Sequence, residues 1–252
     1  MWNFSGKTVL VTGGSRGIGR ACVLAFAKGG ASVAINYNRS DAAAQETLNS
    51  ARALSSNCQI FRADASKLDQ VNVMIADVVK YFGKIDILVN AAGVLRRTPF
   101  LEIAESEWDW VLDINLKGYF LIAQAVAKQM VEQNTGGVIV NISSNNQERA
   151  ATLLTHYNVS KAGVAMLTKT MANELAPYRI RVNNVAPGLT ETDINRKDIA
   201  NKEWREARLA RIPLKVIAKP EEITGAVLFL ASDEAKLITG STVWVDAGAT
   251  IS

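Results

Sequence analysis

Tyr157 and Lys161 are the first two residues whose types and spacing suggest chemistry. They stand four residues apart in the segment HYNVSKAG, which places both side chains on one face of a helical turn. The free pKa of tyrosine is about 10, too high for efficient proton exchange at neutral pH. A cation beside the phenol stabilises the phenolate, so the pair could exchange a proton with an alcohol or a ketone. The same spacing also occurs on exposed helix faces that do no chemistry.

Alternating segments along the chain predict the elements that must position this pair. Short β-branched runs alternate with amphipathic runs such as Val71, Ile75 and Val78, whose spacing is helical. This alternation predicts an α/β fold with a parallel sheet covered by helices on both faces. Ligands on such sheets bind beyond the carboxyl ends of the strands, near the point where strand order reverses. We expect strands over 8–11, 32–35, 59–62, 85–90, 138–142, 181–185 and 242–245.

A glycine-rich turn, residues 12–19 (TGGSRGIG), follows the first expected strand and precedes a helix that begins near Arg20. Its glycines allow a tight turn and a close backbone approach to a pyrophosphate at the helix N-terminus. Its spacing is Gly-x-x-x-Gly-x-Gly, and tight packing alone also demands glycines. The position after the first strand favours the phosphate interpretation. The expected cofactor contacts are Gly13, Ser15, Arg16, Gly17, Ile18 and Gly19.

The end of the second strand indicates which dinucleotide binds. An NAD enzyme places an acidic residue there to hold the ribose hydroxyls, but this chain has Asn38, Arg39 and Ser40, with Asp41 beyond the strand end. Arg39 and Arg16 suit a 2′-phosphate, because guanidinium groups match phosphate geometry. NADP(H) is therefore the preferred cofactor and NAD(H) the alternative. Arg39 could also be a solvated loop residue.

Polar and small residues stand at the ends of the later strands as well. Asp64, followed by Ala65, could accept from an adenine amino group, although Asp64 or Ser66 could instead start a helix. Ser144 could donate to a substrate carbonyl oxygen, and Asn115 stands in mid-helix, where asparagine is a poor helix former. The other expected contacts are Asn90, Ala91, Ala92 and Gly93 for a flat ligand, and Pro187, Gly188, Thr190 and Thr192 for a carboxamide.

Composition narrows the class of protein. The chain has 252 residues, 48% hydrophobic and 21% charged, which suits a single globular α/β domain. The net charge of +4 is mild and the basic residues are scattered, which argues against a nucleic-acid partner. Cys22 and Cys58 are too few and too far apart for a metal site or a disulfide framework. This cysteine content predicts a reduced cytoplasmic protein, and no apolar run approaches the length of a membrane span.

With these motifs in order, the chain resembles the short-chain dehydrogenase/reductase family, in its single-domain branch. The resemblance covers nearly the whole length, from TGGSRGIG through NAAG, Asn115, ISS, YNVSK and RVNNVAPG to ITGSTVWVDAG. It implies a Rossmann-type doubly wound sheet of seven strands and a homotetramer or homodimer. It also implies that Tyr157 is the general acid/base and that Lys161 lowers its pKa and binds the nicotinamide ribose. Ser144 would orient the substrate oxygen, and Asn115 would hold a water linked to Lys161.

The substrate is expected to be a small alcohol or ketone under a lid over about 189–212. The pair Ile194-Asn195 resembles sugar dehydrogenases of the family, and the Asn195 amide suits a polyol hydroxyl. Asn195 could instead cap a lid helix. The expected substrate contacts are Ser144, Asn146, Tyr157 and Asn195. The lid is basic, but interleaved acidic residues predict a solvated helix face rather than an anion funnel.

Two alternatives to a sugar or polyol dehydrogenase stay open. The chain also resembles 3-oxoacyl-carrier-protein reductases, although the basic positions with which those enzymes hold their partner fall on Asn134 and Tyr178 here. Arg179 and Lys128 stand close enough to compensate. A non-catalytic protein that only binds the cofactor is the second alternative. The intact set of Ser144, Tyr157, Lys161 and Asn115 argues against it.

Overall fold

The computed structural model describes residues 2–55 and 57–251 and contains one seven-stranded sheet. All neighbouring strands are parallel, in the order β3-β2-β1-β4-β5-β6-β7. This confirms the predicted parallel sheet and its seven strands. The strands are β1 (Thr8–Val11), β2 (Ser32–Tyr37), β3 (Cys58–Arg62), β4 (Ile87–Asn90), β5 (Gly137–Ile142), β6 (Ile180–Pro187) and β7 (Thr242–Val245).

The fourth strand begins two residues later than expected, and a side chain explains the difference. The Ile85 N–H donates to the Gln133 Oε1 at 2.9 Å, and the Gln133 amide nitrogen donates to the Ile85 carbonyl oxygen at 3.0 Å. Both backbone groups of Ile85 are therefore satisfied by a glutamine rather than by a neighbouring strand.

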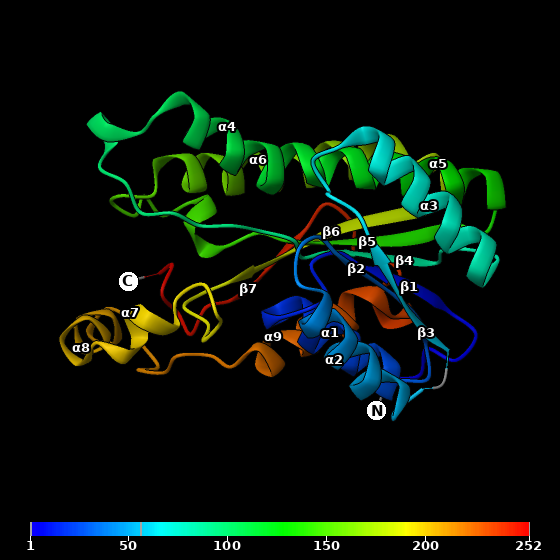
Figure 1. Ribbon diagram of the computed structural model, residues 1–252, viewed down its shortest axis with the longest axis horizontal. Helices are drawn as coiled ribbons and strands as arrows, with labels where there is room; N and C mark the ends of the chain where they lie inside the picture. The colour runs from blue at the N-terminus through cyan, green and yellow to red at the C-terminus, as the bar shows by residue number, and fades with distance from the viewer. Residues whose placement is uncertain (1, 56, 252) are drawn as a thin grey trace.

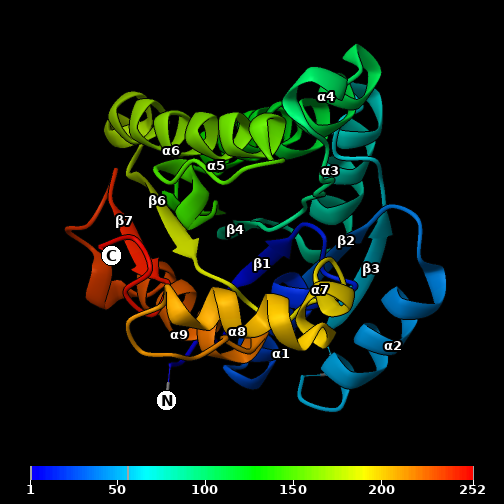
Figure 2. The ribbon, with the colours of Figure 1, turned by 90° about the vertical axis from the view of Figure 1, so that its left-hand side faces the viewer.

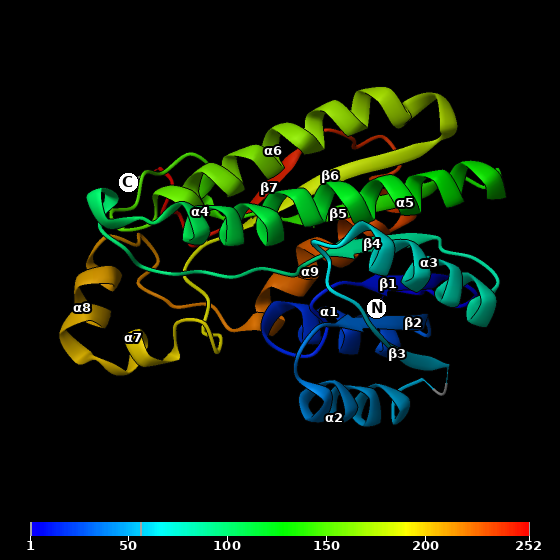
Figure 3. The same cartoon turned by 45° about the horizontal axis from the view of Figure 1, so that its top comes forward.

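Helices cover both faces of the sheet (Figure 1). One layer holds α1 (Gly17–Lys28), α2 (Asp41–Arg52) and α9 (Pro220–Ala231), and the other holds α3 (Leu68–Phe82), α4 (Glu105–Leu112), α5 (Gly118–Gln133) and α6 (Thr155–Leu175). Alternation along β1 feeds the two cores: Val9 and Val11 pack with α1 and α9, whereas Leu10 packs with α3 and α5. Figure 3 shows α5 and α6 running side by side.

Two predicted helix boundaries had different outcomes. Gly83 ends α3 in a left-handed conformation with φ of 82°, as expected of a glycine there. The expectation that Asp64 or Ser66 caps α3 is wrong, because the helix begins at Leu68 after Lys67. The Asp64 carboxylate accepts from the backbone N–H and the hydroxyl of Ser66 instead, at 2.9 and 2.7 Å. No helix in the described part of the chain is long and apolar enough to span a bilayer.

The strand order identifies the edge of the sheet at which a ligand is expected to bind. Strand order reverses at β1, which lies between β2 and β4, so the loops after β1 and β4 separate at the carboxyl edge. Beyond this edge lie two short helices, α7 (Arg196–Ala200) and α8 (Lys202–Ala210), which Figure 2 shows in front of α1 and α9. These helices lie within the expected lid segment.

Candidate active site

A cleft of about 700 Å³ runs along the carboxyl edge of the sheet. Its lining includes every predicted site residue except Asn90 and Asn115. Residues from the glycine-rich turn, from the ends of β2 to β6 and from the lid segment therefore meet around one space. Segments that are far apart in sequence converge there because parallel strands all end at the same edge.

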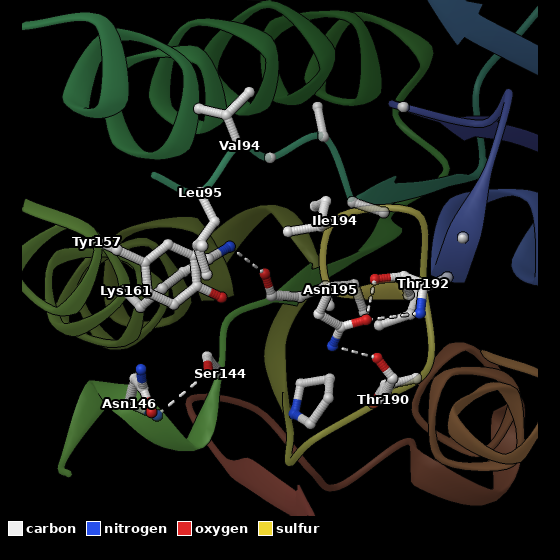
Figure 4. Close-up of a pocket in the computed structure, with 18 of the residues that line it drawn as sticks. Val94, Leu95, Ser144, Asn146, Tyr157, Lys161, Thr190, Thr192, Ile194 and Asn195 are labelled. Carbon is white, nitrogen blue, oxygen red and sulfur yellow. Dashed lines mark hydrogen bonds between the residues drawn. The ribbon is translucent and has the colours of Figure 1, made fainter. Parts of the chain in front are cut away.

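Tyr157 and Lys161 both lie on α6, one helical turn apart, as predicted. The Lys161 Nζ donates to the Ile142 carbonyl oxygen at 3.0 Å and lies 5.8 Å from the centre of the Tyr157 ring. Ser144 follows β5, and its hydroxyl accepts from the Asn146 N–H at 3.1 Å. Figure 4 shows these four residues on one side of the cleft and Thr190, Thr192 and Asn195 on the other. A proton donor, a hydroxyl and a cation therefore face a common space.

Burial governs the protonation of this pair. It lowers the pKa of Lys161 from 10.5 to about 7. It also raises the pKa of Tyr157 above its ordinary value, an effect that the hydrogen bond with Ser144 partly offsets. The expected lowering of the Tyr157 pKa by Lys161 stays a prediction, since burial and the hydrogen bond with Ser144 are the effects that act on Tyr157 here.

Asn115 acts on the backbone beside the cleft. It lies in a π-helical turn, Asp113–Lys117, between α4 and α5 rather than in regular helix. Its Oδ1 accepts from the Val94 N–H at 2.8 Å, and its Nδ2 donates to the Val94 carbonyl oxygen at 2.9 Å. The side chain is fully buried. The π turn is thus associated with a functional segment, as such turns often are, and Asn115 positions the loop segment that follows Gly93.

Asn90 also supports the structure rather than lining the cleft, which corrects its predicted role as a cofactor contact. Its side chain is fully buried and donates to the Asn141 Oδ1 at 3.1 Å. Asn141 donates in turn to the Thr168 hydroxyl at 2.9 Å. This chain of hydrogen bonds joins β4 and β5 to α6, the helix that carries Tyr157.

The glycine-rich turn fits a dinucleotide, and its glycines have different structural roles. A Cβ on Gly19 would lie 2.3 Å from the Gly13 carbonyl oxygen, so Gly19 permits the helix to pack closely on the turn. Gly17 has a φ of +54° and borders the cleft. Arg16 precedes α1 without capping it through its side chain, and no acidic residue occupies the first turn. The N-terminal N–H groups of α1 are therefore available to a phosphate.

The end of β2 presents basic side chains, as predicted. Arg16 and Arg39 are both exposed at the cleft, and Ser40 borders it. Burial raises the pKa of the Asp64 carboxyl, but hydrogen bonds from Ser66 and Asn38 outweigh it and leave that pKa below its ordinary value. Asp64 is thus an anion at neutral pH, able to accept from an amino group but unfavourable beside a phosphate.

Asn195 forms hydrogen bonds within the lid segment. It precedes α7 but does not cap that helix through its side chain. Its Nδ2 donates to the Thr190 carbonyl oxygen at 2.7 Å, and its Oδ1 accepts from the Thr192 N–H at 2.9 Å (Figure 4). Asn195 therefore occupies the predicted N-cap position of α7 through its backbone alone, and its amide is not free but shapes the loop that borders the cleft.

Two supporting residues escaped the sequence reasoning. Tyr119 occupies an apolar helix position, yet its hydroxyl donates to the Ile142 carbonyl oxygen at 2.9 Å and lies 3.4 Å from the Lys161 Nζ. His156 Nδ1 accepts from the Tyr157 N–H at 2.9 Å, while its Nε2 lies 3.0 Å from a Glu107 carboxylate oxygen. His156 is the single histidine of the chain and precedes Tyr157, so a signal for it was present. Tyr119 looked like any core residue.

The lid also differs from the expectation of a solvated basic face. Arg208 and Arg211 of the lid line the cleft, together with Arg97 and Arg149 from other segments. We call these four residues the guanidinium cluster. Three-dimensional convergence produces it, and the sequence of the lid alone does not predict it.

Comparisons with known proteins agree with this site. A family model described as enoyl-(acyl carrier protein) reductase matches residues 13–250. The chain is 40% identical to L-rhamnose 1-dehydrogenase (NAD(P)(+)) of Sphingomonas sp. strain SKA58, over 96% of each chain. It is also 40% identical to a 3-oxoacyl-(acyl-carrier-protein) reductase of Thermotoga maritima, over 98% of each chain. Among solved structures, a gluconate 5-dehydrogenase from Burkholderia cenocepacia J2315 in complex with NADP and tartrate superposes with a TM-score of 0.93 at 33% identity, covering 99% of this chain and 97% of that one.

The family model matches most of the chain. The structure brings Ser144, Tyr157 and Lys161 together beside a glycine-rich turn that fits a dinucleotide, which is the arrangement expected of that family. The protein is therefore an oxidoreductase that acts on CH–OH groups with a nicotinamide cofactor, and it belongs to the short-chain dehydrogenase/reductase family.

Proposed function

We propose that this enzyme is an NADP(H)-preferring sugar or polyol dehydrogenase in which Tyr157 is the general acid/base. The observation that carries the proposal is the meeting of Tyr157, Ser144 and Lys161 in the cleft. The relative named as a rhamnose dehydrogenase supports the substrate class. The relative named as an oxoacyl reductase makes reduction of a 3-oxoacyl thioester the second candidate.

The residues of the chain divide the chemistry among them. When bound, the nicotinamide supplies the acceptor or donor of a hydride at the substrate carbon. In the oxidative direction, the Tyr157 phenolate takes the hydroxyl proton while the C–H bond breaks, so a CH–OH group becomes a carbonyl. The Ser144 hydroxyl donates to the same substrate oxygen. Lys161 has a pKa of about 7, so it can take up or release a proton at neutral pH as Tyr157 changes its protonation state.

Replacing Tyr157 with phenylalanine tests the acid/base role. Tyr157→Phe should abolish turnover while cofactor affinity changes little, because the phenol oxygen alone is lost. Tyr81→Phe is the matched control, since Tyr81 is half exposed and lies outside the cleft. Steady-state assays with both cofactors and calorimetric titration measure the two effects. Activity of Tyr157→Phe near that of the control would contradict the proposed mechanism.

The preference for NADP(H) is supported by Arg16 and Arg39 at the cleft. We expect NADPH to bind more tightly than NADH, and Arg39→Ala to narrow that difference by weakening NADPH alone. Lys80→Ala removes one positive charge from an exposed site outside the cleft and serves as the control. Tighter binding of NADH by the unmodified enzyme would refute the assignment of these arginines.

Substrate class is tested by a turnover screen of sugars, polyols and 3-oxoacyl thioesters with NADP(H) and NAD(H). Oxidation of polyols supports the first candidate. Rapid reduction of oxoacyl thioesters without polyol oxidation would favour the second.

Arg179 is one of the basic residues near the expected carrier-protein positions. It donates to the Asn134 carbonyl oxygen at 2.8 Å, so it is partly engaged within the chain.

We also infer that the enzyme is a homotetramer or a homodimer. An exposed apolar face on α5 and α6 supports this proposal, because monomeric proteins rarely expose large apolar patches. Light scattering after size-exclusion chromatography should give a multiple of the chain mass of 27.2 kDa. A mass of one chain at micromolar concentration would refute it. The exposed side chains on this face include Phe120 and Val131 of α5, and Tyr178 in the short turn after α6 borders it.

A further inference from the structure

The guanidinium cluster is assembled from three separate parts of the chain. Arg97 lies in the loop after β4, and Arg149 lies in the segment that follows Ser144. Arg208 belongs to α8, and Arg211 follows its last turn. All four line the cleft that contains Tyr157. Only the fold brings these side chains together.

An aromatic ring and a carboxylate hold part of the cluster in place. The guanidinium carbons of Arg97 and Arg208 lie 5.7 and 5.1 Å from the centre of the Trp204 ring. The Asp198 Oδ2 accepts from the Nε and Nη2 of Arg97 at 3.2 and 3.0 Å. Two of the four guanidinium groups are therefore oriented before any ligand binds, which reduces the entropy lost on binding.

Positive charge dominates this part of the cleft. Within residues 2–55 and 57–251, the acidic side chains that line it are Asp64 and Asp193, and Asp193 pairs with Arg196 at 2.7 Å. Burial and then the charges of Arg97, Arg211 and Arg149 lower the pKa of Arg208, whereas the Asp198 carboxylate, which Arg97 also binds, acts in the opposite direction. A cleft of one charge sign focuses its field on an incoming ligand of the opposite sign.

We propose that the guanidinium cluster binds an anionic group of the substrate, so that the enzyme acts on polyols that carry a carboxylate or a phosphate rather than on neutral sugars. This inference rests on the proposed polyol dehydrogenase function, because it names the substrate class of that same site. Guanidinium groups bind both oxyanions through paired N–H donors. Arg16 and Arg39 follow β1 and β2 and remain assigned to the cofactor.

Binding of three matched polyols tests the cluster without requiring turnover. Sorbitol is neutral, gluconate has a carboxylate in place of one terminal CH2OH group, and sorbitol 6-phosphate carries a phosphate on a terminal hydroxyl of the same six-carbon chain. Calorimetry on the full chain carrying Tyr157→Phe, which cannot turn the polyols over, and saturated with NADP⁺ should show one of the anionic polyols binding at least about ten-fold more tightly than sorbitol, with a smaller advantage at high salt. The tighter of the two anions identifies the group that the cluster binds.

Variants of the arginines separate the cluster from general effects of charge. Arg208→Gln should weaken binding of the preferred anion about ten-fold or more and change sorbitol affinity far less. Arg205→Gln is the matched control, because Arg205 is exposed on the same helix and does not line the cleft. Arg149→Gln provides a second test if Arg208→Gln does not fold, as judged by thermal melting.

The outcomes distinguish this inference from the proposed function. Equal affinity for all three polyols, or equal losses for anionic and neutral polyols in Arg208→Gln, would overturn the anion site. Oxidation of sorbitol at the rate of gluconate and sorbitol 6-phosphate, with equal affinity, would leave the dehydrogenase function standing and remove the inference. Tight anion binding without oxidation of any polyol would uphold the anion site and refute the polyol function.

Discussion

Burial of Lys161 should destabilise the folded protein in a way that depends on pH. The side chain is 4% exposed, and burial lowers its pKa from 10.5 to about 7. Below pH 7 the folded protein must keep an ammonium group in the interior, whereas the unfolded chain keeps it in water. Between pH 7 and 10.5 the unfolded chain binds more protons than the folded protein, so stability rises with pH through this window.

These two pKa values set the magnitude. The destabilisation is about 5 kcal/mol at pH 6 and falls to about 2 kcal/mol at pH 9. Lys161→Met replaces the buried ammonium with an apolar side chain of similar length and removes this cost. It also removes the hydrogen bond to the Ile142 carbonyl oxygen, which contributes about 1 kcal/mol. We therefore expect Lys161→Met to be about 2–4 kcal/mol more stable than the unmodified enzyme at pH 6, and only about 1 kcal/mol more stable at pH 9.

Urea unfolding between pH 6 and 9 measures this difference, with the free energy of unfolding obtained at each pH. Lys169→Met is the control, because Lys169 is exposed on the same helix and its substitution should give a difference that does not vary with pH. Loss of activity in Lys161→Met would accompany its gain in stability. A difference that stays constant with pH, or a Lys161→Met variant less stable than the unmodified enzyme at pH 6, would refute the reasoning.

Three further predictions follow from packing and hydrogen bonds. Gly19→Ala should destabilise the fold by about 1–3 kcal/mol and weaken cofactor binding, because its Cβ would overlap a backbone oxygen. Gly225 in α9 has open space around it, so Gly225→Ala should stabilise the fold by up to about 1 kcal/mol in the same thermal melts. Asn115→Ala should cost about 2–3 kcal/mol and reduce kcat, since both backbone groups of Val94 lose partners; denaturant unfolding with no loss of stability would contradict this. Asn195→Ala should raise KM with little change in melting temperature, because it loosens the lid loop alone, and an unchanged KM would argue against that role.

Local spacing was sufficient to predict the elements and most of the residues at the cleft. The strand ends, the glycine-rich turn and the pair Tyr157–Lys161 depend on contacts within a few residues, so their patterns are visible in the sequence. Parallel strands then bring all their ends to one edge, and for this reason the predicted residues converge. Asn90 was misassigned because a strand-end position does not reveal which way its side chain points.

The amino-acid sequence by itself determined the family, the sheet and the proposed acid/base pair, because each is encoded in short periodic or spaced motifs. Tertiary structure alone decided the electrostatics. The pKa of Lys161 depends on how completely distant segments exclude water from it, and the guanidinium cluster depends on the approach of α8 to the loops after β4 and β5. Burial and proximity across long sequence separations leave no local pattern, so these properties of the site become visible only in the folded chain.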